Sequence, residues 1–103
     1  MVGSMAFEIE LLPDAWEHLA AFSARDQAIL LDAIEEQLRH QPDQPVRNRK
    51  PLGPNDLAGW ELRVGTYRIF YDIVVDKARV EIIAIGKKER QRLLIGGKEY
   101  NLS

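Results

Sequence analysis

Cysteine is absent from this chain of 103 residues, and histidine occurs only twice, as His18 and His40. The lack of thiols excludes disulfides, thiolate metal sites and cysteine nucleophiles, and it favours a reducing cytoplasm as the compartment. Two histidines are too few for a histidine-rich metal cage. The carboxylates of Asp32, Glu35 and Glu36 lie on one predicted helix, whereas a hard cation needs oxygen ligands from several elements. We therefore expect no metal and no cofactor.

Long hydrophobic runs are also absent. No apolar run approaches the ~18–20 residues that a membrane span needs, so we expect no membrane contact. Apolar residues make up 46% of the chain and charged residues 29%, which is ordinary globular composition. Residues 1–4 resemble an expression-vector remnant ahead of a second methionine, Met5, because no basic and apolar signal segment follows. We expect residues 5–103 to form one domain.

The net charge of −2 conceals an asymmetry between the two halves of the chain. Residues 1–46 contain nine acidic and two basic residues, and residues 47–103 contain twelve basic and seven acidic residues. Two interpretations are open: the basic half binds an anion, or the two halves attract each other within one fold.

The acidic half predicts a strand followed by two helices. Residues 7–11 alternate apolar and acidic side chains, which is typical of a half-buried strand. Pro13 and Asp14 suit the first turn of a helix, and Ser23 suits the N-cap of a second helix that ends near His40. Apolar residues recur at every fourth position of that second helix, which indicates a face packed on the core: Leu30, Ile34 and Leu38.

The basic half begins with a long loop and continues as strands. Residues 41–58 contain four of the five prolines and a basic cluster, and loops of this length are often functional. Residues 60–64 and 67–74 alternate around Gly65-Thr66, which predicts a tight hairpin. A turn at residues 76–77 leads to a strand over residues 79–86.

The predicted order is therefore β-α-α-β-β-β. We expect an α+β fold in which a two-helix hairpin packs on one face of a small antiparallel sheet. Residues 93–100 form either a short terminal hairpin or a tail that lies over the sheet.

The predicted hairpin register places Arg63 directly opposite Arg68 on the face away from the core. Like charges at this spacing are unfavourable by a few tenths of a kcal/mol, unless an acid or a bound anion bridges them. Glu61 is the diagonal acid. Directly after the last long strand, four basic residues fall within Gly86–Arg92, so they converge with the arginine pair and favour an anion site.

The second turn, at residues 76–77, predicts a pairing of Ile69 with Ala84. This register puts an apolar strip on the outer face, formed by Phe70, Ile83 and Ile85. Exposed apolar patches mark binding sites when nothing covers them. The alternative is that the C-terminal segment folds back over the strip.

These residues also carry a family resemblance. The stretch WELRVGTYRIFY from Trp60 to Tyr71, followed by IGKKER at residues 85–90, resembles the RelE/ParE family of toxins in type II toxin–antitoxin systems. The resemblance implies a RelE-like fold and a small cytoplasmic toxin produced with a cognate antitoxin. RelE-type members cleave mRNA in the ribosome, whereas ParE-type members inhibit DNA gyrase.

The resemblance also implies roles for single residues. Arg68 matches the family's arginine at the scissile phosphate, and Lys88 falls where RelE has a second catalytic arginine, so charge is kept without the bidentate geometry. The two RelE lysines fall at Gly59 and Glu61, and the RelE tyrosine falls at about Leu94. Tyr100 follows six residues later.

We therefore predict a metal-independent mRNA endoribonuclease. The predicted catalytic residues are Arg63, Arg68 and Lys88. The predicted RNA-binding residues are Arg49, Lys50, Lys87 and Arg90, and the predicted antitoxin-binding residues are Phe70, Ile83 and Ile85. The alternative from a different class is a binding protein: a ParE-like gyrase inhibitor, or a catalytically weak relative that binds its antitoxin.

Overall fold

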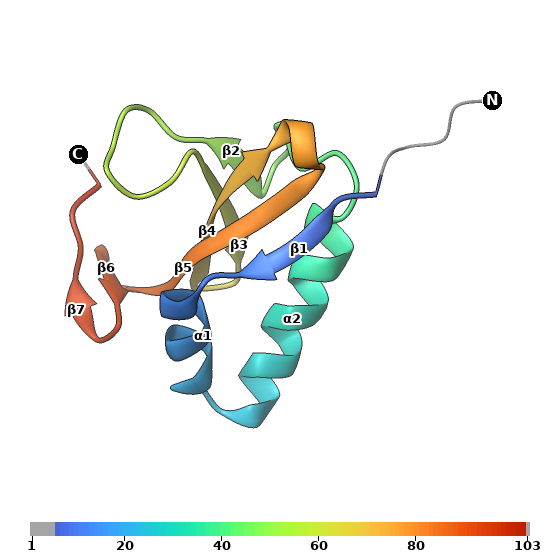
Figure 1. Ribbon diagram of the computed structural model, residues 1–103. Helices are drawn as coiled ribbons and strands as arrows, with labels where there is room; N and C mark the ends of the chain where they lie inside the picture. Colours follow the sequence, from blue (N-terminus) through green and yellow to red (C-terminus); the bar gives the residue numbers. More distant parts are fainter. Residues whose placement is uncertain (1–5, 103) are drawn as a thin grey trace.

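The computed structural model describes residues 6–102 of the chain (Figure 1). The expected vector remnant, residues 1–4, lies outside the described residues. The elements follow the chain in this order: β1 (Glu8–Leu11), α1 (Pro13–Ala20), α2 (Ala24–Leu38), β2 (Arg49–Pro51), β3 (Trp60–Val64), β4 (Tyr67–Val74), a 3₁₀ turn (Val75–Lys77), β5 (Arg79–Glu89), β6 (Arg92–Ile95) and β7 (Lys98–Glu99).

One sheet is formed by all seven strands, and the two helices pack on one of its faces (Figure 1). The spatial order is β2-β3-β4-β5-β6-β7, with every neighbouring pair antiparallel. The predicted α+β fold is confirmed, with one correction: β1 pairs in parallel with β5, so the sheet is mixed. The connection from β1 to its parallel neighbour β5 is long and includes both helices and β2 to β4, and parallel neighbours need a long crossover of this kind.

The helices form for the reasons that their sequences suggest. The Oγ of Ser23 accepts a hydrogen bond of 3.1 Å from the backbone N–H of Asp26, which confirms the predicted N-cap. The predicted apolar face of α2 is completely buried. The helix ends at Leu38, slightly before the predicted His40, and Gln41 then takes a left-handed φ of 53° ahead of Pro42. Neither helix within residues 6–102 has the length and apolar character of a membrane span.

A β-bulge between β4 and β5 changes the predicted faces of the sheet. Tyr71 pairs with Ile82 as expected, but Ile69 pairs with Ile85 and Phe70 with Ala84. The predicted pairing of Ile69 with Ala84 is therefore wrong, because Ile83 is an extra residue in β5. A bulge of one residue moves every following side chain to the opposite face. Ile85 consequently packs in the core beneath the helices.

The expected exposed apolar strip is not present. Phe70 and Ile85 are completely buried, and Ile83 is half-buried. Phe70 forms a second core with Ala84 and Leu93, on the face of the sheet away from the helices, and residues of the 52–58 loop and of the C-terminal segment cover it. The C-terminal segment is thus both a short hairpin and a cover over the sheet. The cover exists because Phe70, once on the outer face, exposes a large apolar area unless another segment buries it.

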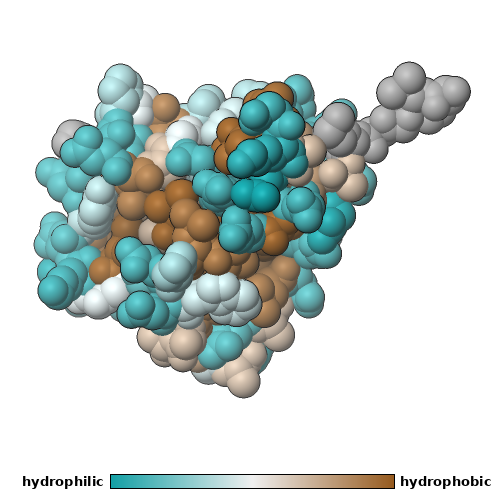
Figure 2. Space-filling model, viewed as in Figure 1, coloured by the Kyte–Doolittle hydropathy of each residue, from teal (hydrophilic) through white to brown (hydrophobic). Residues whose placement is uncertain are grey.

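Hydrophobic side chains gather over the middle of the view in Figure 2, and hydrophilic side chains surround them. The exposed large hydrophobic residues include Trp16, which is 54% exposed, and Val75, which is 75% exposed. Single exposed residues of this kind are normal on a protein surface.

Arg49 is a structural residue and not a surface RNA contact, which corrects its predicted role. Its side chain is buried, with 7% of the residue exposed. Its Nε donates to the carbonyl of Gln44 at 3.0 Å, and its NH1 group donates to the carbonyl of Gln37 in the last turn of α2. The last carbonyls of a helix have no partner within the helix, so this guanidinium both satisfies one of them and complements the helix dipole.

We predict that Arg49→Ala lowers the free energy of unfolding by about 1–3 kcal/mol, because it leaves buried carbonyl groups without a donor. Urea denaturation followed by circular dichroism measures the change. The matched control is Arg47→Ala, two residues away and exposed, which we expect to stay within about 0.5 kcal/mol of the wild type. Equal effects of the two substitutions would contradict the structural role of Arg49.

Candidate functional site

A cleft of about 450 Å³ lies on the face of the sheet opposite the helices. Five adjacent strands, β2 to β6, each contribute one cationic side chain to it: Lys50, Arg63, Arg68, Lys88 and Arg92. We call this the cationic cleft. Strand alternation explains the convergence of the first four, because residues on one face of neighbouring strands lie within a few ångströms of one another. Arg92 pairs with Glu89 next to the β5–β6 turn and lines the cleft from the start of β6. The cleft brings together the three predicted catalytic residues and Lys50.

The two arginines at the centre of the cleft oppose each other as predicted. Arg63 pairs directly with Arg68 across β3 and β4. Arg68 is anchored through its NH1 group, which donates to the carbonyls of Gly65 and Tyr67, each at 2.9 Å. Its buried Nε has no hydrogen-bond partner among the described residues.

Glu61 supplies the counter-charge at this point. Its side chain is only 7% exposed, and its Oε2 accepts a hydrogen bond of 3.2 Å from Nε of Arg63. Burial lowers the pKa of the Arg68 guanidinium, the negative charge of Glu61 raises it, and the positive charge of Arg63 lowers it. One carboxylate thus pairs with one of two facing guanidinium groups and acts on the other only through its charge, and a bound anion would relieve the remaining repulsion.

Gly86 makes room for the next strand beside this pair. It lies directly opposite Arg68 in the register of β4 and β5. A β-carbon at this position would stand 2.8 Å from the carbonyl oxygen of Leu94 and 2.9 Å from a side-chain carbon of Ile95. Any larger residue would therefore push β6 away from β5 and open the far side of the cleft.

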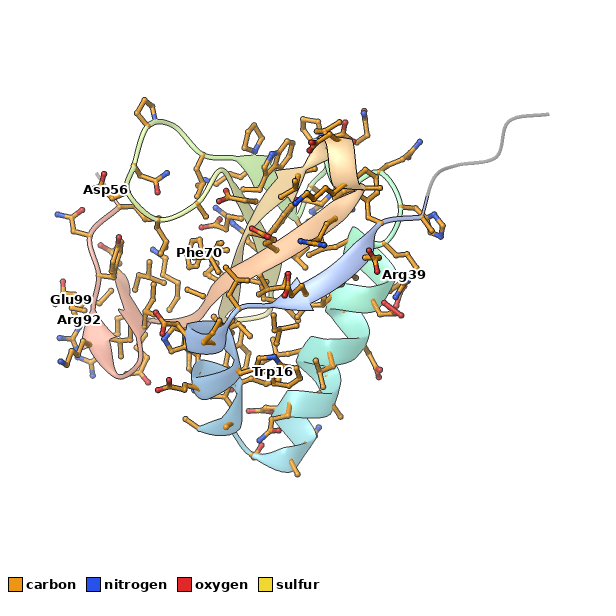
Figure 3. All side chains as sticks on the ribbon, viewed as in Figure 1. Trp16, Arg39, Asp56, Phe70, Arg92 and Glu99 are labelled. Atoms are coloured by element: carbon orange, nitrogen blue, oxygen red, sulfur yellow. The ribbon has the colours of Figure 1, made fainter. Side chains whose placement is uncertain are left out.

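Sequence reasoning assigned no catalytic or binding role to four residues that line the cleft: Glu61, Arg92, Glu99 and Tyr100. Glu61 was predicted only as a bridging acid, although its alternation with Arg63 already placed both on one face. Arg92 and Glu99 lie beside each other on the C-terminal hairpin (Figure 3), with NH1 and Oε1 3.7 Å apart. Tyr100 borders the cleft, and its N–H donates to the carbonyl of Leu93 at 2.8 Å. Arg92 was expected near the arginine pair as part of the basic run. Glu99 and Tyr100 had no predicted position, because a hairpin over residues 93–100 was only one of two expectations.

Several predicted residues lie elsewhere. Lys87 points to the helix side of the sheet, where its Nζ is 5.6 Å from the centre of the Tyr67 ring. Arg90 is exposed at the β5–β6 turn with a φ of 61°, and it does not line the cleft. Gly59 and Leu94 also lie outside the cleft lining. Lys87 and Lys88 are neighbours in a strand, so only one of them can face the cleft.

Neither of the two histidines lines the cationic cleft. His18 lies on the helix side of the sheet and His40 follows α2. Within residues 6–102, no group of three or more histidine, aspartate or glutamate side chains is arranged to hold a metal ion.

The β3–β4 hairpin, which carries Arg68, is attached to the helices through Tyr67. The hydroxyl of Tyr67 donates to Oδ2 of Asp26 at 2.6 Å, and its ring packs edge-on against Phe22 at 4.8 Å between centroids. The hydrogen bond to Asp26, together with burial and the negative charge of that carboxylate, raises the pKa of Tyr67 to about 12.

We predict that Asp26→Asn moves the ionisation of Tyr67 from about 12 towards the ordinary tyrosine value of 10. Ultraviolet titration of phenolate absorbance measures the shift, and Tyr67→Phe identifies the transition. The raised pKa also makes stability depend on pH. Tyr67 ionises at a lower pH in the unfolded state than in the folded state, so its protonated form stabilises the fold fully below pH 10. This contribution is lost as pH rises towards 12. An unchanged titration in Asp26→Asn would contradict the assigned hydrogen bond.

The fold and the cleft together define a small α+β domain with a cationic cleft on its sheet. A family model described as the ParE toxin of the type II toxin–antitoxin system, parDE, matches residues 9–92. The chain therefore belongs to this family of toxins. The resemblance inferred from the WELRVGTYRIFY and IGKKER blocks is confirmed.

Two solved structures share the fold. A chain of the RelBE2 toxin–antitoxin complex from Mycobacterium tuberculosis aligns with a TM-score of 0.71 and 23% identity, over 82% of this chain and 93% of that chain. A chain of the intact RelBE toxin–antitoxin complex from E. coli aligns with a TM-score of 0.60 and 20% identity, over 82% of this chain and 100% of that chain. No curated protein sequence matches the chain at a significant level.

Proposed function

We propose that this toxin is a metal-independent endoribonuclease that cleaves mRNA in the cytoplasm and is neutralised by a cognate antitoxin. One observation carries the proposal: a cationic side chain from each of five adjacent strands converges on one cleft that also contains a buried carboxylate. A polyanion with closely spaced phosphates is the ligand that such a row of cations fits.

The central arginines would act on the phosphate that reacts. RNA cleavage without a metal proceeds when the 2′-hydroxyl attacks the adjacent phosphorus, and extra negative charge then develops on the phosphate oxygens. Arg63 and Arg68 stand on both sides of the place where that charge would form, and charge stabilisation of this kind is usually the largest catalytic contribution. Lys50 and Arg92 lie at the two ends of the row and would hold flanking phosphates.

The proton transfers need an acceptor and a donor. Glu61 is the buried carboxylate of the cleft, so we assign it the role of general base, which accepts the proton of the 2′-hydroxyl. Lys88 would return a proton to the 5′-oxygen that leaves. The new bond joins the 2′-oxygen to phosphorus and the bond from phosphorus to the 5′-oxygen breaks, which leaves a 2′,3′-cyclic phosphate and a 5′-hydroxyl.

A second candidate function is inhibition of DNA gyrase by binding. It is favoured by the family description, which names parDE, and by the departures at Gly59 and Leu94, which match no family catalytic residue and lie outside the cleft. In this alternative the cationic cleft contacts a protein target. Ribosome profiling after brief induction separates the two: codon-phased cuts support RNA cleavage, and gyrase-linked DNA damage supports the alternative.

An antitoxin partner follows from the same family, and the two solved structures described above are of toxin–antitoxin complexes. The cationic cleft favours an acidic partner. The predicted docking strip is not open to such a partner, because Phe70 and Ile85 are completely buried and Ile83 is half-buried against the second core. An antitoxin would neutralise the toxin either by covering Arg63 and Arg68 or by displacing the C-terminal segment around residues 94–100.

We predict that Arg68→Ala abolishes growth arrest and lowers RNA cleavage by about 10²–10³-fold, because one charged contact to the transition state is lost. Cleavage of ribosome-bound mRNA measures the rate, and thermal unfolding verifies the fold. The matched control is Lys77→Ala, an exposed cation in the 3₁₀ turn outside the cleft lining, which should retain full activity. A folded Arg68→Ala protein with wild-type toxicity would overturn the assignment.

We also predict that RNA binding weakens steeply with salt, because each phosphate contact releases counterions. The measurement is the affinity for a non-cleavable 2′-deoxy oligonucleotide between 50 and 200 mM salt. Lys88→Gln should reduce the slope of log affinity against log salt by about one. Lys87→Gln is the adjacent control on the opposite face, and it should leave the slope unchanged. The same slope in all three proteins would exclude this footprint.

A further inference from the structure

The edge of β5 has a gap between two partner strands. β1 pairs with β5 along residues 79–82, and β6 pairs with the same strand along residues 86–89. Residues 83–85 therefore lie between the two partners. A backbone N–H at such a gap needs a partner from outside the sheet, because an unpaired buried donor is costly.

His18 of α1 supplies that partner. The backbone N–H of Ile85 donates to Nδ1 of His18 at 3.2 Å. Ile85 is completely buried, so water is a poor substitute for the imidazole. Since Nδ1 accepts a hydrogen bond, the neutral ring carries its proton on Nε2.

The same imidazole lies beside the turn of the C-terminal hairpin, and both line one cleft. Gly96 and Gly97 connect β6 to β7 with positive φ angles of 61° and 78°. A β-carbon at Gly96 would lie 3.6 Å from Nε2 and from Cδ2 of His18, which is van der Waals distance. His18 thus lies between α1, the gap in β5 and the hairpin, at the centre of a cleft of about 440 Å³.

We propose that His18 is a pH-sensitive positioning residue that joins the C-terminal hairpin to the body of the domain. The neutral imidazole accepts the Ile85 N–H and holds the hairpin turn against α1. The imidazolium has no acceptor, since both ring nitrogens then donate, so protonation breaks the bond. The junction of α1, β5 and the hairpin then opens locally.

The charges around the imidazole come from two elements. Glu17 of α1 and Glu89 of β5 attract the imidazolium, and Lys87 of β5 repels it; all three line the same cleft. The Gly96-Gly97 turn contributes no side-chain charge.

The hairpin connects this junction to the cationic cleft on the other face of the sheet. Arg92 of β6, Glu99 of β7 and Tyr100 all border the cationic cleft. The hairpin stays paired with β5 and packed in the second core. Opening at its turn would shift these three residues, so the outer wall of the cleft would change position at low pH. This effect goes beyond the proposed RNA cleavage and does not depend on it.

Amide hydrogen exchange of Ile85, measured by NMR in the full chain, tests the proposal. After correction for the intrinsic pH dependence of exchange, we expect protection to fall at least tenfold between pH 8 and pH 5.5. His18→Asn keeps an acceptor oxygen at the position of Nδ1 without titrating, and it should protect Ile85 equally at both values. His18→Leu should leave Ile85 unprotected at both. Equal protection in the wild type and His18→Leu, or the same pH profile in His18→Asn, would overturn the proposal.

A second measurement needs only the wild-type chain, should a variant fail to fold. The amide shifts of Ile85, Arg92 and Tyr100 should titrate with the midpoint of the His18 imidazole carbons. Different midpoints, or shifts that stay constant through the His18 titration, would overturn the proposal. Neither experiment uses RNA, so failure here leaves the proposed function unaffected, and loss of RNA cleavage would leave this inference unaffected.

Discussion

The pairing of β4 with β5, and the single bulge within it, determines most of what this domain can do. Before the bulge, the hydrophobic residues of both strands face the helices in regular alternation. The extra residue at Ile83 reverses the faces for the rest of β5. Ile85 enters the core, Phe70 meets Ala84 on the outer face, and Lys88 instead of Lys87 lines the cationic cleft. Without the bulge, the site would hold a different lysine.

Electrostatics in the cleft follow from that register. Two guanidinium groups face each other across β3 and β4, and one buried carboxylate pairs with one of them. Such an arrangement contributes little to the stability of the fold, because the like charges repel each other and the buried carboxylate loses its hydration. It is well suited to a ligand that carries negative charge. Arg49 also belongs to the basic stretch of the chain, but it has a different role. Its guanidinium donates a hydrogen bond to a backbone carbonyl at the end of α2.

The C-terminal segment links three features that seem separate along the chain. It covers Phe70, it completes the cationic cleft through Arg92 and Tyr100, and its glycine turn lines one cleft with His18. Any partner or pH change that moves this segment therefore acts on the second core and on the cleft at once. A two-strand hairpin with few residues has little stability of its own, so it depends on these contacts.

The sequence by itself determined the α+β class, the helices with their cap at Ser23, the β3–β4 hairpin and the facing pair Arg63 and Arg68, because periodicity and turn chemistry act over a few residues. It also carried the family, through two short blocks. Tertiary structure alone decided the bulge, and with it the burial of Ile85 under the helices and the choice between Lys87 and Lys88. It also decided the burial of Phe70 under the 52–58 loop and the C-terminal segment. It likewise decided the parallel pairing of β1, the burial of Arg49 and the contact of His18 with Ile85. Each of these depends on residues far apart in the chain, and local patterns contain no information on which distant groups will meet.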